Sequence, residues 1–152
     1  MANIQIIVGS MLGGTEYVAE ACEETLVEQG HNVTLHLTPE FSEIPTEDQI
    51  WLICTSTHGA GDYPDNIQPF INALEKEDHD LSPLPFFVIG TGDSDYDTFC
   101  FAAINIEKLL ISKGCDKLIP IKVIDMQQDI DPEEAAREWI ASNIDRLRPN
   151  NP

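Results

Sequence analysis

Short apolar runs of strand length alternate along this chain with longer segments of helical periodicity. Runs of strand character occur at 4–8, 33–37, 50–54, 84–89 and 118–124. Helical segments are expected at 15–29, at 66–77, before Lys113-Gly114, and at 131–147. This alternation predicts an α/β fold, a doubly wound five-stranded parallel sheet with helices on both faces. Five strands suit the strand order 2-1-3-4-5.

The first and last expected helices carry recognisable faces and ends. Apolar side chains of the first helix gather on one face, which comprises Val18, Ala19, Cys22 and Leu26. Gly30 follows that helix and is a suitable C-terminal stop. Asp131 as N-cap and Pro132 at the first helical position favour the start of the last helix.

Three irregular segments, 9–15, 55–65 and 90–97, follow the first, third and fourth expected strands. The carboxyl ends of parallel strands lie at one edge of a sheet. Ligands of such sheets bind at that edge, near the switch point between the first and third strands. We therefore expect these three segments to form one binding site.

Composition and charge restrict the class of protein. With 152 residues, 42% of them hydrophobic, the chain suits one domain, placed at 1–148 with a C-terminal tail at 149–152. The formal net charge is −19, and no Lys or Arg precedes Lys76. Nucleic acids and anionic membranes attract cationic proteins, so we expect neither as a partner. The acidic surface either keeps the protein soluble or steers a basic protein partner.

The sequence indicates neither a membrane span nor a secretory leader. No apolar run approaches the roughly 20 residues that cross a bilayer, and residues 1–4 contain no basic side chain. The widely spaced cysteines form no C-x-x-C pair, which favours small apolar core residues over a metal or dithiol site. They are Cys22, Cys54, Cys100 and Cys115. We expect a cytoplasmic monomer without a bound metal.

The first irregular segment runs from Gly9 to Thr15 and links a strand to a helix N-terminus. Hydroxyls and backbone N–H groups at such a position can hold a phosphate, helped by the helix dipole. The spacing is close to that of a nucleotide P-loop, but Thr15 follows Gly14 directly, without the lysine. ATP or GTP hydrolysis is therefore not expected. A monophosphate site and an ordinary tight turn are both compatible with this segment taken alone.

The other two segments are rich in glycine and aspartate. The stretch from Ser56 to Asn66 is too long for a minimal connection, and its glycines let the backbone approach a flat ligand. By itself, His58 is more typical of a solvated loop. Tyr96 stands between two aspartates, which disfavours burial in the core. The Gly90-Thr91-Gly92 sequence is not a dinucleotide fingerprint, because no third glycine follows at the required spacing.

Together the three segments resemble the loops of flavodoxins. The resemblance covers essentially the whole chain and is clearest with short-chain MioC-type flavodoxins and with the FMN domains of diflavin reductases. Residues 10–15 are similar to the phosphate loop of the family, residues 56–62 to its first flavin loop and residues 92–100 to its second. No long insertion splits the fifth strand, as in the short-chain group. The resemblance implies a flavodoxin-like fold and FMN as the cofactor.

The resemblance also implies the cofactor-binding residues. They are Ser10, Met11, Leu12, Gly13, Gly14, Thr15, Thr57, His58, Gly59, Ala60, Gly61, Thr91, Gly92, Asp95, Tyr96, Phe99 and Cys100. Those of the first loop, Met11 apart, would hold the phosphate, and Tyr96 would stack on the outer face of the isoalloxazine ring. His58 stands where many relatives carry Trp or Tyr, and Leu12 where threonine is common, so we expect weaker FMN binding than in typical flavodoxins. The Gly59-Ala60 peptide matches the one that turns its carbonyl toward the flavin in the family.

The resemblance implies an electron carrier rather than an enzyme, with no catalytic residue, because the flavin does the chemistry. Its partners would be an NADPH-dependent ferredoxin/flavodoxin reductase and redox acceptor enzymes. A phosphoacceptor receiver domain shares the fold order, but it needs acidic residues where this chain has Val8-Gly9-Ser10 and Cys54-Thr55-Ser56. A flavin-free binding module with the same fold is the remaining alternative, and the colour of the purified protein distinguishes it.

Overall fold

The computed structural model describes residues 2–10, 14–57, 62–76, 80–81, 84–92, 100–125 and 131–147. Its strands are β1 (Asn3–Gly9), β2 (Asn32–His36), β3 (Ile50–Ser56), β4 (Pro85–Gly92), β5 (Asp116–Lys117) and β6 (Lys122–Asp125). Its α-helices are α1 (Gly14–Glu28), α2 (Gln68–Lys76), α3 (Phe101–Ser112) and α4 (Pro132–Ser142). Two short 3-10 helices are η1 (Phe41–Glu43) and η2 (Ile144–Arg146). The expected tail at 149–152 lies outside the described residues.

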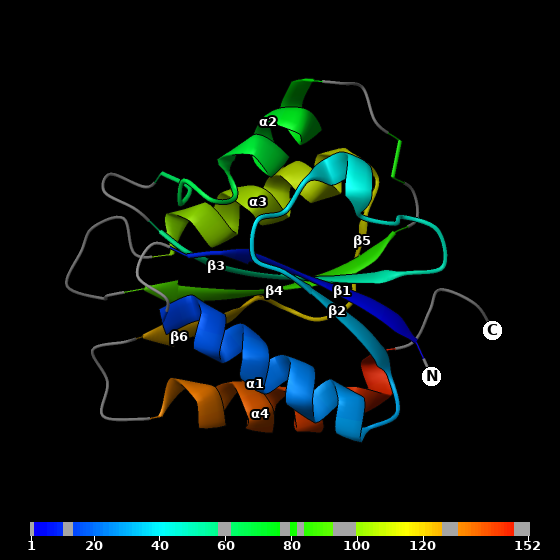
Figure 1. Cartoon of the computed structure of the whole chain (residues 1–152), viewed down its shortest axis with the longest axis vertical. Coiled ribbons are helices and arrows are strands. Elements are labelled where there is room, and N and C mark those ends of the chain that lie inside the picture. The colour runs from blue at the N-terminus through cyan, green and yellow to red at the C-terminus, as the bar shows by residue number, and fades with distance from the viewer. Residues whose placement is uncertain are drawn as a thin grey trace.

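The strands form one parallel sheet between two layers of helices. The strand order is β2-β1-β3-β4-β5, and β6 also pairs with β4. Helices α1 and α4 cover one face of the sheet, and α2 and α3 cover the other (Figure 1). The doubly wound arrangement predicted from the sequence is confirmed.

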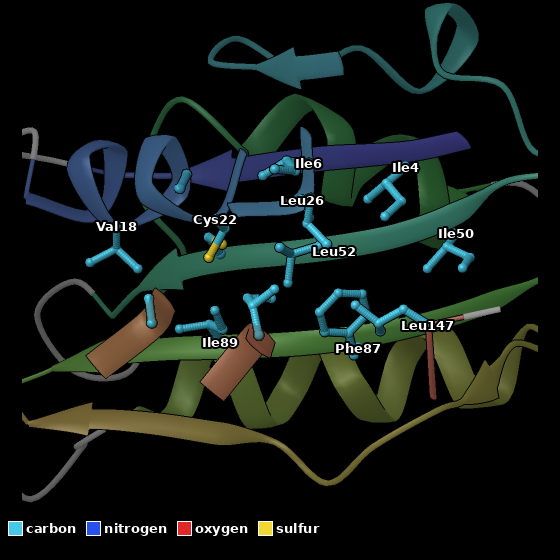
Figure 2. Close-up of a cluster of buried hydrophobic side chains, with 14 of the residues drawn as sticks. Ile4, Ile6, Val18, Cys22, Leu26, Ile50, Leu52, Phe87, Ile89 and Leu147 are labelled. Carbon is cyan, nitrogen blue, oxygen red and sulfur yellow. The ribbon is translucent and has the colours of Figure 1, made fainter. Parts of the chain in front are cut away.

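The core is divided by the sheet into two layers, because successive residues of a strand face opposite sides. In β1, Ile6 and Val8 belong to the cluster under α1 and α4, whereas Ile7 belongs to the cluster under α2 and α3. Figure 2 shows the first cluster, to which α1 contributes the predicted face with Val18, Cys22 and Leu26. All four cysteines are unpaired and buried, which confirms their prediction as core residues.

The helices begin and end where local signals place them. After α1, Gly30 adopts a φ of +90°, and the N–H of His31 donates to the carbonyl of Leu26 at 3.1 Å. The Asp131 side chain caps α4 by accepting from the N–H groups of Glu133 and Glu134, with Pro132 at the helix start. In the part of the chain that the structure describes, no helix is long and apolar enough to span a membrane.

The fifth strand differs from its prediction as one continuous strand over 118–124. Its place beside β4 is shared by β5 and β6, which are separated by residues 118–121. The register passes from Phe86↔Lys117 to Ile89↔Lys122, so the interrupted strand advances by more residues than β4 does. Pro120 lies in the interruption and has no N–H to donate to a ladder, which explains why the strand breaks there.

Two central strands extend further toward the expected binding edge than the sequence predicted. β3 continues through Ser56 and β4 through Gly92, because the register between them extends to Ser56↔Thr91 and that between β4 and β6 extends to Gly92↔Asp125. Thr91, which was predicted in a turn-rich loop, is therefore a strand residue, and only 2% of its surface is exposed.

Candidate functional site

The carboxyl ends of β1, β3 and β4 meet at one edge of the sheet. The register places Gly9 beside Thr55, and Ser56 beside Thr91. The segments that leave these three strands therefore start side by side, as predicted. Figure 1 shows that the strands run toward this edge from the side on which the N-terminus lies. The edge includes the β1/β3 switch point, where doubly wound sheets bind their ligands.

Two glycines let the backbone pack closely at this edge. A Cβ atom on Gly9 would lie 2.5 Å from Oγ1 of Thr55, and one on Gly90 would lie 2.6 Å from Cβ of Ala103. Both distances are far below the usual contact of about 3.5–4.0 Å between heavy atoms. The second contact brings the start of α3 directly onto β4, and so fixes where α3 begins relative to the site.

A buried pair of hydroxyls connects the first and third predicted loops. Oγ1 of Thr15 and Oγ1 of Thr91 are 2.9 Å apart, and either atom can donate. The side chains come from the first turn of α1 and from the end of β4, and both are buried. The N–H groups of the first helical turn have no acceptor within the helix. Gly14 and Thr15 therefore start a helix whose positive dipole end faces the binding edge.

Asn66 makes three hydrogen bonds that join separate parts of the site. Its Oδ1 accepts from the N–H of Ser10 at 2.8 Å. Its Nδ2 donates to the carbonyls of Val8 at 2.8 Å and Leu37 at 2.9 Å. Sequence reasoning placed Asn66 at the end of a loop and assigned it no role. The only sequence signal was an asparagine next to a glycine-rich loop, which does not reveal partners so far away along the chain.

The start of α3 is capped by a side chain that lies just after β3. Cys100 precedes the helix with a φ of 58°, and its side chain makes no capping hydrogen bond. Instead, Oγ1 of Thr57, directly after β3, accepts from the N–H of Ala102 at 3.0 Å. Burial, with a smaller contribution from Asp125, raises the pKa of the Cys100 thiol to about 11. Cys100 is therefore a protonated packing residue at neutral pH.

Seven of the predicted cofactor residues are described, and the structure brings them to the same edge. They are Ser10, Gly14, Thr15, Thr57, Thr91, Gly92 and Cys100. The others lie outside the described residues. These are Met11, Leu12, Gly13, His58, Gly59, Ala60, Gly61, Asp95, Tyr96 and Phe99. The described members offer only neutral groups, which are hydroxyls, backbone amides and the buried thiol of Cys100.

The electrostatic surroundings are acidic. Asp62 and Asp65, at the end of the second loop, are both exposed. No Lys or Arg occurs before Lys76 in the chain. Among the residues that the structure describes, no group of three or more His, Cys, Asp or Glu side chains could hold a metal ion. A ligand with a phosphate would therefore be held by dipoles and hydroxyls, without a cationic side chain from residues 1–75.

The fold and this edge define a doubly wound α/β protein with a neutral, phosphate-compatible site at its switch point. The flavodoxin family model matches residues 6–139. The chain is 45% identical to the MioC homologue of Pasteurella multocida over 95% of its length and 98% of the relative. It is 44% identical to Escherichia coli MioC over 97% of this chain and 100% of the relative. It is 36% identical to E. coli flavodoxin YqcA over 92% of this chain and 95% of the relative.

Solved structures agree with this assignment. A cysteine-to-alanine mutant of flavodoxin from Pseudomonas aeruginosa superposes with a TM-score of 0.87 at 30% identity, over 95% of this chain and 98% of that one. A Streptococcus pneumoniae flavodoxin superposes with a TM-score of 0.82 at 26% identity, over 96% and 100%. The chain belongs to the flavodoxin family. Membership implies a flavin cofactor and a role in electron transfer.

Proposed function

We propose that this protein binds one FMN at the carboxyl edge of its sheet and carries electrons between proteins. The donor would be an NADPH-dependent ferredoxin/flavodoxin reductase, and the acceptors would be redox enzymes. The observation that carries the proposal is the set of neutral polar groups at the start of α1 and at or just after the ends of β1, β3 and β4, at the switch point of a chain in the flavodoxin family. Bound FMN would supply reversible transfer of one or two electrons.

The described residues fit a phosphate ester. Gly14 and Thr15 open α1, where backbone N–H groups and the helix dipole favour an anion. The backbone N–H of Ser10 already donates to Asn66, so the contribution of Ser10 to a phosphate would come from its hydroxyl. If Thr91 donates to Thr15, the Thr15 hydroxyl keeps its own hydrogen for a ligand. We propose that Leu12 and Gly13 complete this phosphate site.

The other residues would hold and position the ring. Thr57 and Thr91 fix the ends of β3 and β4, where the first and second flavin loops start, because each threonine is hydrogen-bonded to another element. Tyr96 would supply the stacking surface. Nearby carboxylates raise the free energy of negative charge at the site and would lower the potential for full reduction. None of these roles requires an acid, a base or a nucleophile, so we propose an electron carrier without a catalytic residue.

We also propose a cytoplasmic, monomeric carrier. The four cysteines are free and buried, and unpaired thiols persist in reducing compartments. The formal net charge of −19 opposes self-association. Light scattering should give the mass of one chain, and a dimer would contradict this part of the proposal. The exposed Asp62 and Asp65 support docking of a basic partner.

A flavin titration tests the central proposal. Purified apoprotein is titrated with FMN and with riboflavin, which has the same ring but no phosphate, while flavin fluorescence is followed. We expect one FMN per chain and clearly tighter binding of FMN than of riboflavin. Ser10→Ala should weaken FMN by roughly two- to tenfold, the scale of one hydrogen bond, and leave riboflavin unchanged. Equal affinities for both ligands would show that the phosphate site is not used, and no binding of either would favour a flavin-free module.

A further inference from the structure

The ladder between β1 and β2 stops just before the site. Its register ends at Ile7↔His36, because the chain bends at 37–38. The N–H of Asn32 donates to the carbonyl of Ala2 at 2.9 Å. Alternate residues of a strand direct their backbone groups to the same neighbour, so the even-numbered residues of β1 face β2. The carbonyl of Val8 and the N–H of Ser10 are thus the pair that a longer β2 would have bound.

Asn66 takes the place of this missing rung. A primary amide carries the same donor and acceptor as a peptide group. Its Nδ2 donates to the Val8 carbonyl at 2.8 Å, and its Oδ1 accepts from Ser10 N–H at 2.8 Å. The second Nδ2 hydrogen goes to the carbonyl of Leu37 at 2.9 Å, just beyond the end of β2. A reversed amide would oppose donor to donor and acceptor to acceptor, so this network fixes its orientation.

From this geometry we infer that Asn66 is a positioning residue for the phosphate loop. Ser10 is the residue with which the chain leaves β1 toward that loop, and Asn66 holds its N–H on the β2 side. The start of the loop is therefore oriented before any ligand arrives, which lowers the entropic cost of binding. Asn66 acts through Ser10 and not on the ligand. The inference rests on the proposed FMN function and makes Asn66 a determinant of selectivity for the phosphate ester.

The first test compares Asn66→Ala with a matched control. Asn72 is an exposed asparagine in the next helix, and its Oδ1 accepts from Nε2 of Gln68 at 2.9 Å. Asn66→Ala should weaken FMN binding about tenfold, because it removes ordered hydrogen bonds beside the loop. Riboflavin affinity should change by less than about twofold. Asn72→Ala should leave both affinities unchanged.

A second variant provides a pH signature. In Asn66→Asp, the carboxylate can still accept from Ser10, but it faces the carbonyls of Val8 and Leu37 without a hydrogen to donate. Protonation restores one donor and removes the charge. The FMN affinity of Asn66→Asp relative to wild type should therefore recover as the pH falls from about 7 to about 4.5, toward the ordinary range of an aspartate. Asn66→Ala should show no such recovery, because it cannot gain a proton.

Amide hydrogen exchange in the apoprotein completes the test without a cofactor. The Ser10 amide should be protected in wild type and in Asn72→Ala, and should lose its protection in Asn66→Ala. Equal wild-type affinity for FMN and riboflavin would overturn the proposed function. An unchanged FMN-to-riboflavin ratio in Asn66→Ala would overturn only the role of Asn66, as would rapid exchange of Ser10 in wild-type apoprotein. The wild-type exchange rate still decides the matter if Asn66→Ala fails to fold.

Discussion

The contact between β4 and α3 predicts the effect of one added methyl group. A Cβ on Gly90 would lie 2.6 Å from Cβ of Ala103, and 3.4 Å from Sγ of Cys100. Because carbon atoms normally pack about 3.5–4.0 Å apart, α3 must move outward by about 1 Å in Gly90→Ala. Overpacking of this kind costs about 1–3 kcal/mol. For a chain of this size, we expect the melting temperature to fall by about 3–10 °C.

A double-mutant cycle tests whether this contact is the cause. Ala103→Gly removes the opposing methyl and costs about 1 kcal/mol from helix propensity alone. Gly90→Ala/Ala103→Gly should be more stable than the sum of the single variants by about 1–2 kcal/mol, measured by urea unfolding. The control is Gly30→Ala. Nothing lies within 4 Å of its added Cβ, and its cost comes from a φ of +90°. It should show no coupling to Ala103→Gly, and additive free energies in the Gly90 cycle would refute the steric argument.

Three further predictions concern the cofactor, the partner and pH. Tyr96→Ala should weaken FMN binding by about 1–3 kcal/mol in a fluorescence titration, and wild-type affinity would rule out stacking by Tyr96. Electron transfer from a basic reductase should slow as salt shortens the Debye length below about 8 Å. The triple variant Asp93→Asn/Asp95→Asn/Asp97→Asn should be slower and less salt-sensitive than wild type, whereas equal flat salt profiles would mean that these aspartates serve only solubility. Burial lowers the pKa of His31, whose Nδ1 accepts from the N–H of Ala2 at 3.0 Å. Neutral His31 thus stabilises the fold above its ordinary pKa of 6.5. The melting temperature of wild type should exceed that of His31→Ala at neutral pH, and this difference should shrink as the pH falls through the lowered pKa. A difference that stays constant with pH would contradict this.

The topology was predictable because it depends on periodic patterns that local sequence carries. Buried strands such as β3 begin with continuous apolar runs, and α1 shows its apolar face at helical spacing. Gly30 and Asp131 mark helix ends by their own backbone and side-chain chemistry. The break in the fifth strand was missed, although Pro120 lay within the predicted run. A proline is compatible with a strand edge, so its effect depends on neighbours that the sequence does not reveal.

The connections within the site were less accessible to sequence reasoning. The loops after β1, β3 and β4 could be placed together, because parallel strands share an edge. The hydroxyl pair of Thr15 and Thr91 could not be predicted, since the two residues are 76 positions apart in the sequence. The role of Asn66 depends on where β2 stops, and the cap that Thr57 provides depends on how α3 meets β3. These are tertiary contacts, and no local pattern encodes the identity of their partners.

The hydrogen bonds made by Thr57 and Asn66 have a consequence for protein engineering. Thr57 is bound to the start of α3, and Asn66 is bound to β1 and to the chain beyond β2. The second loop is thus anchored to the scaffold at each end by a side chain of its own. A library that varies 58–62 and keeps both anchors, the core-packed Tyr63 and the buried Pro64 should retain the parent fold at high frequency. Redox tuning and partner recognition could then be explored by changing this one loop. Folding would be screened separately from flavin binding, which the colour of the protein reports.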